Sequence, residues 1–165
     1  LACRQSLHRA KNEGSAVPVI TLDAREVPSE PAAWETVQLP LAPALLTCAI
    51  TNLVDNALRY HRGPTSVSAT LQWHAGPAGD GQVEICVRDQ GPGLTADECG
   101  HALKRFWRKS GSDPGSGLGL TIVHRIAESA GGTLVLEPGT PGLVARLRLS
   151  TCAADAAPAH GIAPG

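Results

Sequence analysis

The chain has 165 residues, a formal net charge of −1 and 42% hydrophobic residues. This length suits one domain with a real hydrophobic core. The absence of a long basic run argues against a nucleic-acid-binding surface, and no apolar run reaches the about 18 residues that cross a membrane. The first residues include Arg4, His8, Arg9 and Lys11 without an apolar core, which argues against a signal peptide. Because the chain starts at Leu1 and contains no methionine, we expect a fragment of a longer protein.

The pattern of apolar residues, taken in chain order, predicts alternating helices and strands in one layered domain. Helices are expected at residues 2–12, 43–61 and 119–130. Strands are expected at residues 17–24, 34–39, 66–74, 82–89, 133–137 and 143–149, and Pro18 suggests that the first of them lies at a sheet edge. Residues 1–150 are therefore expected to form the domain. Residues 151–165, mostly Ala, Pro and Gly, are expected to form a disordered tail.

The cysteine pattern favours a reducing compartment. The five cysteines are odd in number and show no C-x-x-C spacing. Free thiols in a cytoplasmic protein account for this pattern better than a disulfide framework does.

The long helix predicted at residues 43–61 has two distinct faces at about 100° per residue. One face is apolar and carries Leu46, Ala49, Ile50, Leu53, Val54 and Ala57. The other carries Asn52, Asn56 and Arg59, with Asp55 and Tyr60 beside them. Asn is a mediocre helix former, so two of them one turn apart call for a reason. The stripe is either an ordinary solvated face or a site where Asn oxygen binds Mg²⁺ together with waters and phosphates.

A second polar cluster follows the strand predicted at residues 82–89. Asp89 lies at the strand end, and Gly91 and Gly93 come directly after it. The carboxylate can accept a hydrogen bond from an exocyclic amine, and the glycines allow a flat ring to approach the backbone closely. A tight turn would give the same pattern, so the motif alone is not specific.

Two further motifs lie between residues 103 and 120. In the sequence LKRFWR, Phe106 and Trp107 stand between basic residues, as a partly exposed anchor or as the end of a packed helix. The sequence GSGLGL opens the last predicted helix, where a glycine-rich loop presents unpaired N–H groups to a phosphate. The spacing of its glycines is neither that of a Walker loop nor that of a dinucleotide-binding turn.

Taken together, the order NLVDNALRY, DQGPG, RFWR and GSGLGLTIV resembles the N box, first glycine box, F box and second glycine box of sensor histidine kinases. Their catalytic ATP-binding domain belongs to the GHKL (Bergerat-fold) superfamily, and the resemblance covers residues 1–149. It implies an α/β two-layer sandwich, in which a mixed, mostly antiparallel sheet is covered on one face by about three helices. It also implies the cofactors ATP and Mg²⁺.

The resemblance assigns a role to each polar group of the four boxes. Asp89 would bind the adenine amino group, and Asn56 would hold Mg²⁺. Asn52 would support the metal or the attacking group, and Arg59 would lie near the phosphates, so the catalytic residues implied are Asn52, Asn56 and Arg59. The remaining nucleotide contacts implied are Tyr60, Gly91, Gly93, Phe106, Arg108, Gly115, Ser116, Gly117, Leu118, Gly119 and Leu120. Residues 94–114 would form a lid over the phosphates, and its short polar stretch between Phe106 and Gly115 is expected to be loose without nucleotide.

Two departures from the wider superfamily shape the expected activity. The gyrase-type members carry a glutamate that activates water where this chain has Asn52, and an amide has no comparable basicity. Transfer to a histidine is therefore favoured over ATP hydrolysis. The phosphoacceptor itself is missing, because His8 is followed neither by an acid nor by a nearby proline.

The resemblance thus implies the cytoplasmic catalytic domain of a bacterial sensor kinase anchored in the inner membrane. Its partners would be ATP or ADP, its own dimerisation domain, which is absent here, and a response regulator, with no nucleic acid. Without the phosphoacceptor domain we expect a monomeric and inactive fragment. The alternatives are an anti-sigma-type serine kinase and a nucleotide-sensing module without phosphotransfer activity.

Overall fold

The computed structural model describes residues 20–25, 37–62, 67–75, 81–109 and 116–153. Six strands in these residues form one sheet: β1 (Ile20–Arg25), β2 (Val37–Gln38), β3 (Val67–Ala75), β4 (Gly81–Arg88), β5 (Thr133–Pro138) and β6 (Leu143–Ala153). The order is β1-β3-β4-β6-β2, and β5 also pairs with β6. Strand β1 runs parallel to β3, whereas the other pairs are antiparallel. The predicted mixed, mostly antiparallel sheet is therefore confirmed, with β1 at its edge.

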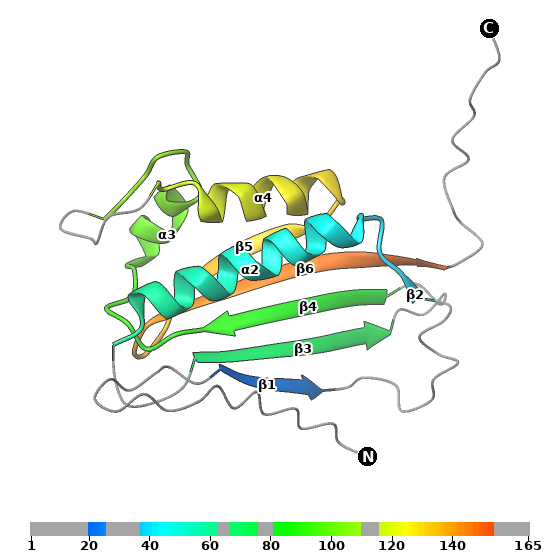
Figure 1. Cartoon of the computed structure of the whole chain (residues 1–165), viewed down its shortest axis with the longest axis horizontal. Helices are drawn as coiled ribbons and strands as arrows, with labels where there is room; N and C mark the ends of the chain where they lie inside the picture. Colours follow the sequence, from blue (N-terminus) through cyan, green and yellow to red (C-terminus); the bar gives the residue numbers. More distant parts are fainter. Residues whose placement is uncertain (1–19, 26–36, 63–66, 76–80, 110–115, 154–165) are drawn as a thin grey trace, which may run out of the picture.

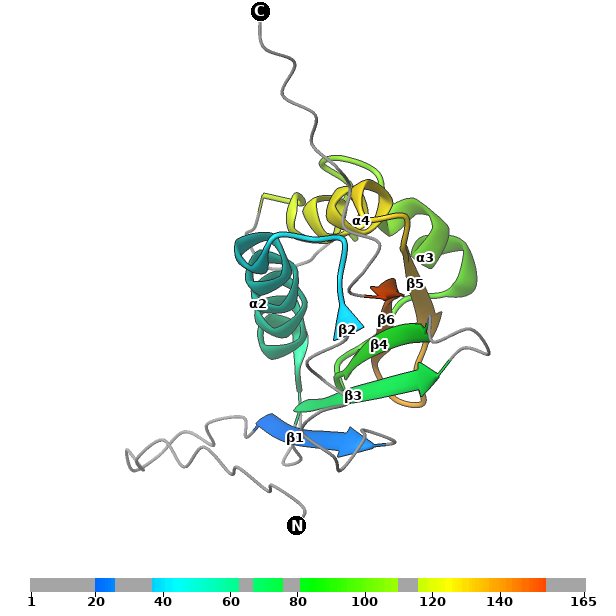
Figure 2. The same cartoon turned by 90° about the vertical axis from the view of Figure 1, so that its right-hand side faces the viewer.

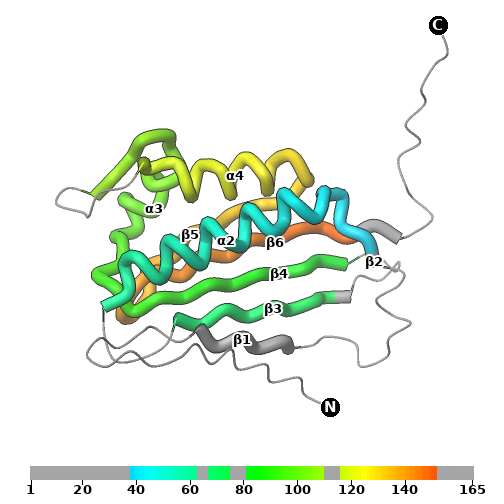
Figure 3. Tube along the Cα trace, viewed as in Figure 1, coloured from blue at the N-terminus to red at the C-terminus, as the bar shows by residue number. Residues whose placement is uncertain are grey.

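Three helices in the described residues pack on one face of this sheet: α2 (Pro43–Tyr60), α3 (Ala96–Ala102) and α4 (Gly119–Ser129). Figures 1 and 2 show α2 and α4 running along the same face of the sheet, with α3 near one end of α4. The two-layer α/β sandwich is thus confirmed. The tube in Figure 3 shows how far β6 extends beneath the helices.

Helix α2 forms where the apolar stripe predicted it and ends one residue earlier, at Tyr60. Pro43 is accepted at its start because the first helical N–H groups have no partner inside a helix. Ala49, Leu53 and Ala57 are buried at spacings of four residues, so the helix lies flat on the sheet. Burial of this stripe leaves Asn52 and Asn56 on the side that faces α4 and the cavity described below.

The two faces of the sheet differ in character. On β4, Val83, Ile85 and Val87 are buried in the core beneath the helices. Glu84 alternates to the other face, where its carboxylate accepts hydrogen bonds of 2.7 Å each from Arg146 Nη1 and Arg148 Nε of β6. The core therefore lies between sheet and helices, and the opposite face holds an ion-pair network.

The last helix and strand pair form as predicted, with one extension. Helix α4 ends at Ser129, and Gly131 follows with a φ of +64°, a conformation that glycine adopts without a steric penalty. Strand β6 continues to Ala153, beyond the predicted end at residue 149, because its last residues pair with the two-residue strand β2. Residues 151–153, which the sequence assigned to the disordered tail, are therefore strand, and the rest of that segment lies outside the described residues.

The third helix is not one that the sequence analysis predicted. The helix expected at residues 2–12 lies outside the described residues, whereas α3 occupies the first half of the predicted lid. Thr95 Oγ1 accepts a hydrogen bond from the Glu98 N–H, and Glu98 Oε2 accepts one from the Thr95 N–H, which is a capping box. Cys99 and Ala102 are buried against the core. Residues 96–102 of the expected lid are thus helix, whereas residues 110–114 of the stretch expected to be loose lie outside the described residues.

The structure describes the side chains of three cysteines. Cys48, Cys86 and Cys99 are all free thiols. Only Cys99 is fully buried, and burial raises the pKa of both the Cys86 and the Cys99 thiol. No helix in the described part of the chain is both long enough and apolar enough to cross a membrane.

Candidate functional site

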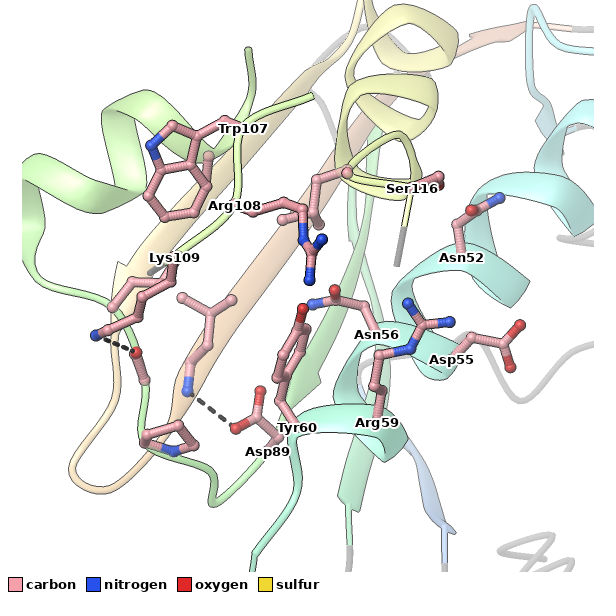
Figure 4. A pocket seen from close by; sticks show the side chains of 18 of the residues that line it. Asn52, Asp55, Asn56, Arg59, Tyr60, Asp89, Trp107, Arg108, Lys109 and Ser116 are labelled. Atoms are coloured by element: carbon pink, nitrogen blue, oxygen red, sulfur yellow. Dashed lines mark hydrogen bonds between the residues drawn. The ribbon is translucent and has the colours of Figure 1, made fainter. Parts of the chain in front are cut away.

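A cavity of about 440 Å³ opens between α2, α3, the start of α4 and the end of β4. This volume lies within the range of small-molecule sites in proteins. Figure 4 shows Arg108 and Asn56 pointing into it from opposite walls. The side chains that line the cavity are Asn52, Asp55, Asn56, Arg59, Tyr60, Arg62, Asp89, Pro92, Gly93, Leu94, Ala102, Trp107, Arg108, Lys109, Ser116, Gly117, Gly119, Leu120 and Leu143.

One end of the cavity is built around the buried carboxylate of Asp89, whose residue is 4% exposed. Its Oδ1 accepts hydrogen bonds from the N–H of Gly91 at 2.7 Å and from the N–H of Leu143 at 3.3 Å. Burial raises the pKa of Asp89, and these two backbone bonds oppose the rise. Oδ2 accepts no hydrogen bond from the described residues. The carboxylate is therefore held rigidly by one oxygen and offers the other as an acceptor.

Three backbone segments meet around Asp89 so closely that side chains are excluded. A Cβ at Gly91 would lie 2.2 Å from the carbonyl oxygen of Tyr60, and a Cβ at Gly93 would lie 2.4 Å from that of Gly142. A Cβ at Gly142 would lie 2.0 Å from the carbonyl oxygen of Asp89. Contacts under 3.0 Å with backbone atoms cannot be relieved by moving a flexible side chain. The glycines thus let the end of α2, the loop after β4 and the β5–β6 hairpin close into one wall.

The other end of the cavity is polar and positively charged. Arg59 and Arg108 lie beside Asn56 at this end (Figure 4), Arg62 and Lys109 also line the cavity, and Asp55 is the acidic residue on the neighbouring part of α2. This excess of cationic groups suits a polyanionic ligand such as a chain of phosphates.

Asn52 joins α2 to the start of α4 at this polar end. Its Nδ2 donates a hydrogen bond of 2.8 Å to the carbonyl oxygen of Cys48, one turn earlier. A Cβ at Gly119 would lie 3.2 Å from Asn52 Oδ1, so glycine allows the first turn of α4 to approach this amide. The N-terminus of α4 therefore opens into the cavity beside Asn52, where its unpaired N–H groups suit an anion.

Asn56 is the residue that the sequence assigned to Mg²⁺. Among the described residues, no group of three or more His, Cys, Asp or Glu side chains is placed to hold a metal ion. Asn56 instead offers one amide oxygen inside a cavity whose lining carries more cationic than acidic side chains. Such a donor set fits Mg²⁺ that arrives with phosphate oxygens and waters as its other ligands.

Most of the predicted site residues come together in this cavity. Those that line it are Asn52, Asn56, Arg59, Tyr60, Asp89, Gly93, Arg108, Ser116, Gly117, Gly119 and Leu120. Gly91 and Leu118 do not line it, although Gly91 holds Asp89 and Leu118 is the N-cap of α4. Gly115 lies outside the described residues.

Phe106 does not line the cavity either, although the sequence analysis placed it among the nucleotide contacts. Its side chain is 64% exposed, and its backbone has a φ of +62°, which is unusual for a bulky residue. The Phe106 N–H donates to the carbonyl oxygen of Gly117, and the guanidinium of Arg105 lies 5.0 Å from the ring centre. This strained turn links the F-box sequence to the second glycine box and faces the ring outward.

Several residues of the cavity were not predicted as contacts. They are Asp55, Arg62, Pro92, Leu94, Ala102, Trp107, Lys109 and Leu143. Leu143 could not be found from local sequence, because the hairpin that brings it to Asp89 is formed 54 residues later in the chain. Trp107 and Lys109 flank the predicted Arg108, so their place beside it could have been expected.

The fold and this cavity define an α/β sandwich with a site for a nucleotide, in which a buried acceptor at one end faces a cationic end. The chain belongs to the family described as histidine kinase-, DNA gyrase B- and HSP90-like ATPases, which it matches over residues 42–151. The resemblance to sensor histidine kinase ATP-binding domains is thereby confirmed.

Known proteins similar to the chain agree with this family. The chain is 36% identical over 124 residues to the signal transduction histidine-protein kinase AfsQ2 of Streptomyces coelicolor, covering 73% of this chain and 21% of the relative. It is 43% identical over 93 residues to the sensor protein QseC of Salmonella typhi, covering 56% of this chain and 19% of the relative. The chain thus matches about a fifth of the length of these relatives.

A solved structure extends the agreement to three dimensions. The mycobacterial sensor histidine kinase MprB superposes with a TM-score of 0.62 at 26% identity, covering 81% of this chain and 83% of that chain.

Proposed function

We propose that this domain binds Mg·ATP and transfers the γ-phosphoryl group to a histidine on the dimerisation domain of a two-component sensor kinase. The observation that carries this proposal is the single cavity that joins the buried Asp89 to Asn52, Asn56 and the cationic side chains. An adenine amine would donate to the open Oδ2 of Asp89. The triphosphate would then extend toward the N-terminus of α4.

The residues at the polar end support phosphoryl transfer by positioning and by charge. Asn56 would hold the metal, and Arg59 and Arg108 would bind the phosphates. Mg²⁺, when bound, would neutralise charge on the β- and γ-phosphates. Asn52 is a poor proton acceptor because it is an amide, and its Nδ2 already donates to Cys48. At the position of Asn52 the cavity therefore offers no base comparable to a glutamate for activating water, which favours transfer to a histidine over hydrolysis.

An apolar surface beside the cavity supports docking of a helical phosphoacceptor domain. Leu45 is 44% exposed, Ile122 is 39% exposed, and a shallow groove runs between them on α2 and α4. Arg105 and Arg125 border the groove, and Cys48, whose carbonyl oxygen accepts a hydrogen bond from Asn52 of the cavity, lines it together with Leu118. An amphipathic helix with an apolar stripe and acidic flanks fits such a surface. The groove would therefore bring a histidine close to the γ-phosphate.

The wider setting of the domain follows from the same proposal. The whole protein would pass its phosphoryl group to a response regulator, and this domain would act in the cytoplasm, below an anchor in the inner membrane. An anti-sigma-type kinase would instead transfer phosphate to serine, and a sensing module would bind ATP without transfer. The acceptor residue that becomes labelled distinguishes these three functions.

The test replaces Asn56 by Ala and uses Thr51→Ala, an exposed position on the same helix, as the matched control. Asn56→Ala removes the proposed metal ligand without touching the buried stripe of α2, and Ala is the better helix former. The unliganded variant should therefore keep its melting temperature. It should lose most Mg²⁺-dependent ATP binding and all transfer to a dimerisation-domain histidine supplied in trans.

The wild-type domain alone should not label itself, whereas the Thr51→Ala control should transfer as the wild type does. An Asn56→Ala variant that transfers phosphate at the wild-type rate would contradict the proposal. Stoichiometric acid-labile self-labelling of this chain would contradict it as well.

A further inference from the structure

Lys109 lines the cavity next to Arg108, yet its ammonium group is bonded elsewhere. Its Nζ lies 3.0 Å from Glu98 Oε2 and 3.3 Å from the carbonyl oxygen of Gly93. Figure 4 shows the second of these contacts as a dashed line, with the side chain of Lys109 running along one wall of the cavity. Lys109 therefore joins the chain that follows the F-box sequence to two other elements of the site.

The Glu98 carboxylate that pairs with Lys109 is also held by a hydrogen bond that does not involve Lys109. Glu98 Oε2 also accepts the Thr95 N–H at 2.8 Å as part of the capping box of α3. The Thr95 N–H and the Lys109 hydrogen bond lower the pKa of Glu98, so it is an anion at neutral pH. Because Glu98 is held in place by the helix cap, little further side-chain freedom is lost when Lys109 pairs with it. The side chains of Lys109 and Glu98 are 39% and 28% exposed, so water screens the pair only in part.

The second contact of Lys109 reaches the wall that holds the base. Gly93 has a φ of +64° and packs against Gly142, which in turn abuts Asp89. A bond to the Gly93 carbonyl therefore connects the segment 107–109 with the loop that carries Asp89. This segment also carries Arg108. The contacts of Lys109 therefore link Arg108, at the polar end of the cavity, to the loop of Asp89 at the other end.

We propose that Lys109 is a positioning residue for nucleotide binding, acting through a clasp made of Lys109, Glu98 and the Gly93 carbonyl. The clasp holds the segment 107–109 against the base-binding loop, so that Asp89 and Arg108 are presented together before the nucleotide arrives. The inference rests on the proposed function, since it requires that the cavity binds a nucleotide. It assigns to Lys109 a role distinct from that of a phosphate ligand.

A direct phosphate ligand would respond in the opposite way to the loss of Glu98. In that case Lys109 would have to leave Glu98 to reach the phosphates, and Glu98→Gln would free it and tighten binding. A clasp needs the pair intact, so Glu98→Gln should weaken binding as Lys109→Gln does. Gln at position 98 still accepts the Thr95 N–H, so the cap of α3 is retained.

The experiment measures the affinity of the full chain for AMP, ADP and a non-hydrolysable ATP analogue by calorimetry with Mg²⁺. The variants are Lys109→Gln, Glu98→Gln, the double variant and the conservative Lys109→Arg. Lys104→Gln is the matched control, because Lys104 contacts His101 and lies outside the cavity. Each single variant should weaken all three nucleotides by a similar factor of about three- to fivefold, as expected for a partly exposed pair.

The double variant should bind no more weakly than either single variant, and Lys109→Arg should restore most of the affinity. Hydrogen exchange at residues 107–109 should quicken in both single variants and remain unchanged in the Lys104→Gln control. Unchanged affinity in both single variants would overturn the clasp and leave the proposed function intact. A loss in Lys109→Gln that grows with each phosphate, with tighter binding in Glu98→Gln, would overturn it in favour of a phosphate ligand. Wild-type protein that binds none of the three nucleotides would overturn the proposed function and the clasp with it.

Discussion

The replacement of Asp89 by Asn tests base recognition with little disturbance of the fold. Asp89 Oδ1 accepts two backbone N–H groups, and Asn can keep both bonds if its own Oδ1 takes that place. The amide nitrogen must then stand where Oδ2 stood, because the reverse orientation would point an NH₂ group at two N–H donors. The variant therefore presents a donor to the adenine amine, which is itself a donor.

The magnitude follows from that exchange of an acceptor for a donor. A buried hydrogen bond left unmade costs about 1–3 kcal/mol, which corresponds to about 5- to 150-fold in affinity for ATP. Inosine carries an acceptor oxygen where adenine carries its amine, so the preference of the variant should shift toward ITP. The raised pKa of Asp89 indicates that its ionised form is disfavoured by burial in the folded chain. The unliganded variant should therefore melt at the wild-type temperature or above it.

Calorimetric titration of ATP and ITP into both proteins, with melting curves of the unliganded forms, checks this reasoning. Protonation of Asp89 removes the acceptor for the adenine amine, so the wild type should lose ATP affinity as the pH falls. Because the pKa of Asp89 is raised, this loss should begin at a higher pH than it would for a carboxyl group with an ordinary pKa. The Asp89→Asn variant should lack this pH dependence. Wild-type affinity in the variant would remove Asp89 from the base site. An equal loss of ATP and ITP affinity would mean that the variant damages the cavity rather than its recognition.

Three further outcomes can be measured on the same protein. Glu84→Gln should lower stability by about 1–2 kcal/mol, since two charged hydrogen bonds weaken at partly exposed arginines, and lower the melting temperature by about 3–6 °C. Burial would raise the pKa of Glu84, but its hydrogen bonds to Arg148 and Arg146 outweigh burial and hold the pKa below its ordinary value of 4.5. The stability that Glu84 contributes is therefore present above pH 4.5 and is lost as the pH falls through the lowered pKa of the folded chain. Gly142→Ala should destabilise the chain more than Gly131→Ala does. Both glycines have a positive φ, but a Cβ at Gly142 would clash with the backbone of Asp89, whereas nothing lies within 4 Å of a Cβ at Gly131. Equal melting temperatures of the two variants would refute this. Hydrogen exchange at residues 94–109 should slow more with an ATP analogue than with ADP, and equal protection in both states would argue against closure of this segment over the phosphates.

Sequence patterns predicted those helices and strands in which burial of side chains recurs at a regular spacing. The apolar stripe of α2 is visible in sequence because burial recurs every three or four residues, and it also predicts which side carries Asn52 and Asn56. Strand β3 forms within one residue of the predicted range 66–74, and its alternate residues Leu71 and Trp73 pair with Ile85 and Val83 of β4. Leu71 is nevertheless still partly exposed, because alternation predicts the face on which a residue lies and not how far a helix covers it.

The parts that sequence reasoning missed depend on short elements or on distant contacts. Helix α3 has only seven residues, too few for a periodic pattern to stand out. Its capping box of Thr95 and Glu98 was nevertheless readable as a helix start. The bonds from Leu143 to Asp89 and from Lys109 to Glu98 join residues that meet only when the sheet and helices are assembled. No local pattern contains that information.

The central place of β6 in the sheet has a consequence for how the chain folds. This strand pairs with β4, β5 and β2, and it is the last element of the described chain. During synthesis, β4 therefore exposes an unpaired strand edge until residues 143–153 have left the ribosome, a state that favours aggregation. The same delay applies to the cavity, because one of the two backbone N–H groups that orient Asp89 belongs to Leu143. Nucleotide can then stabilise only the finished domain and not an earlier intermediate.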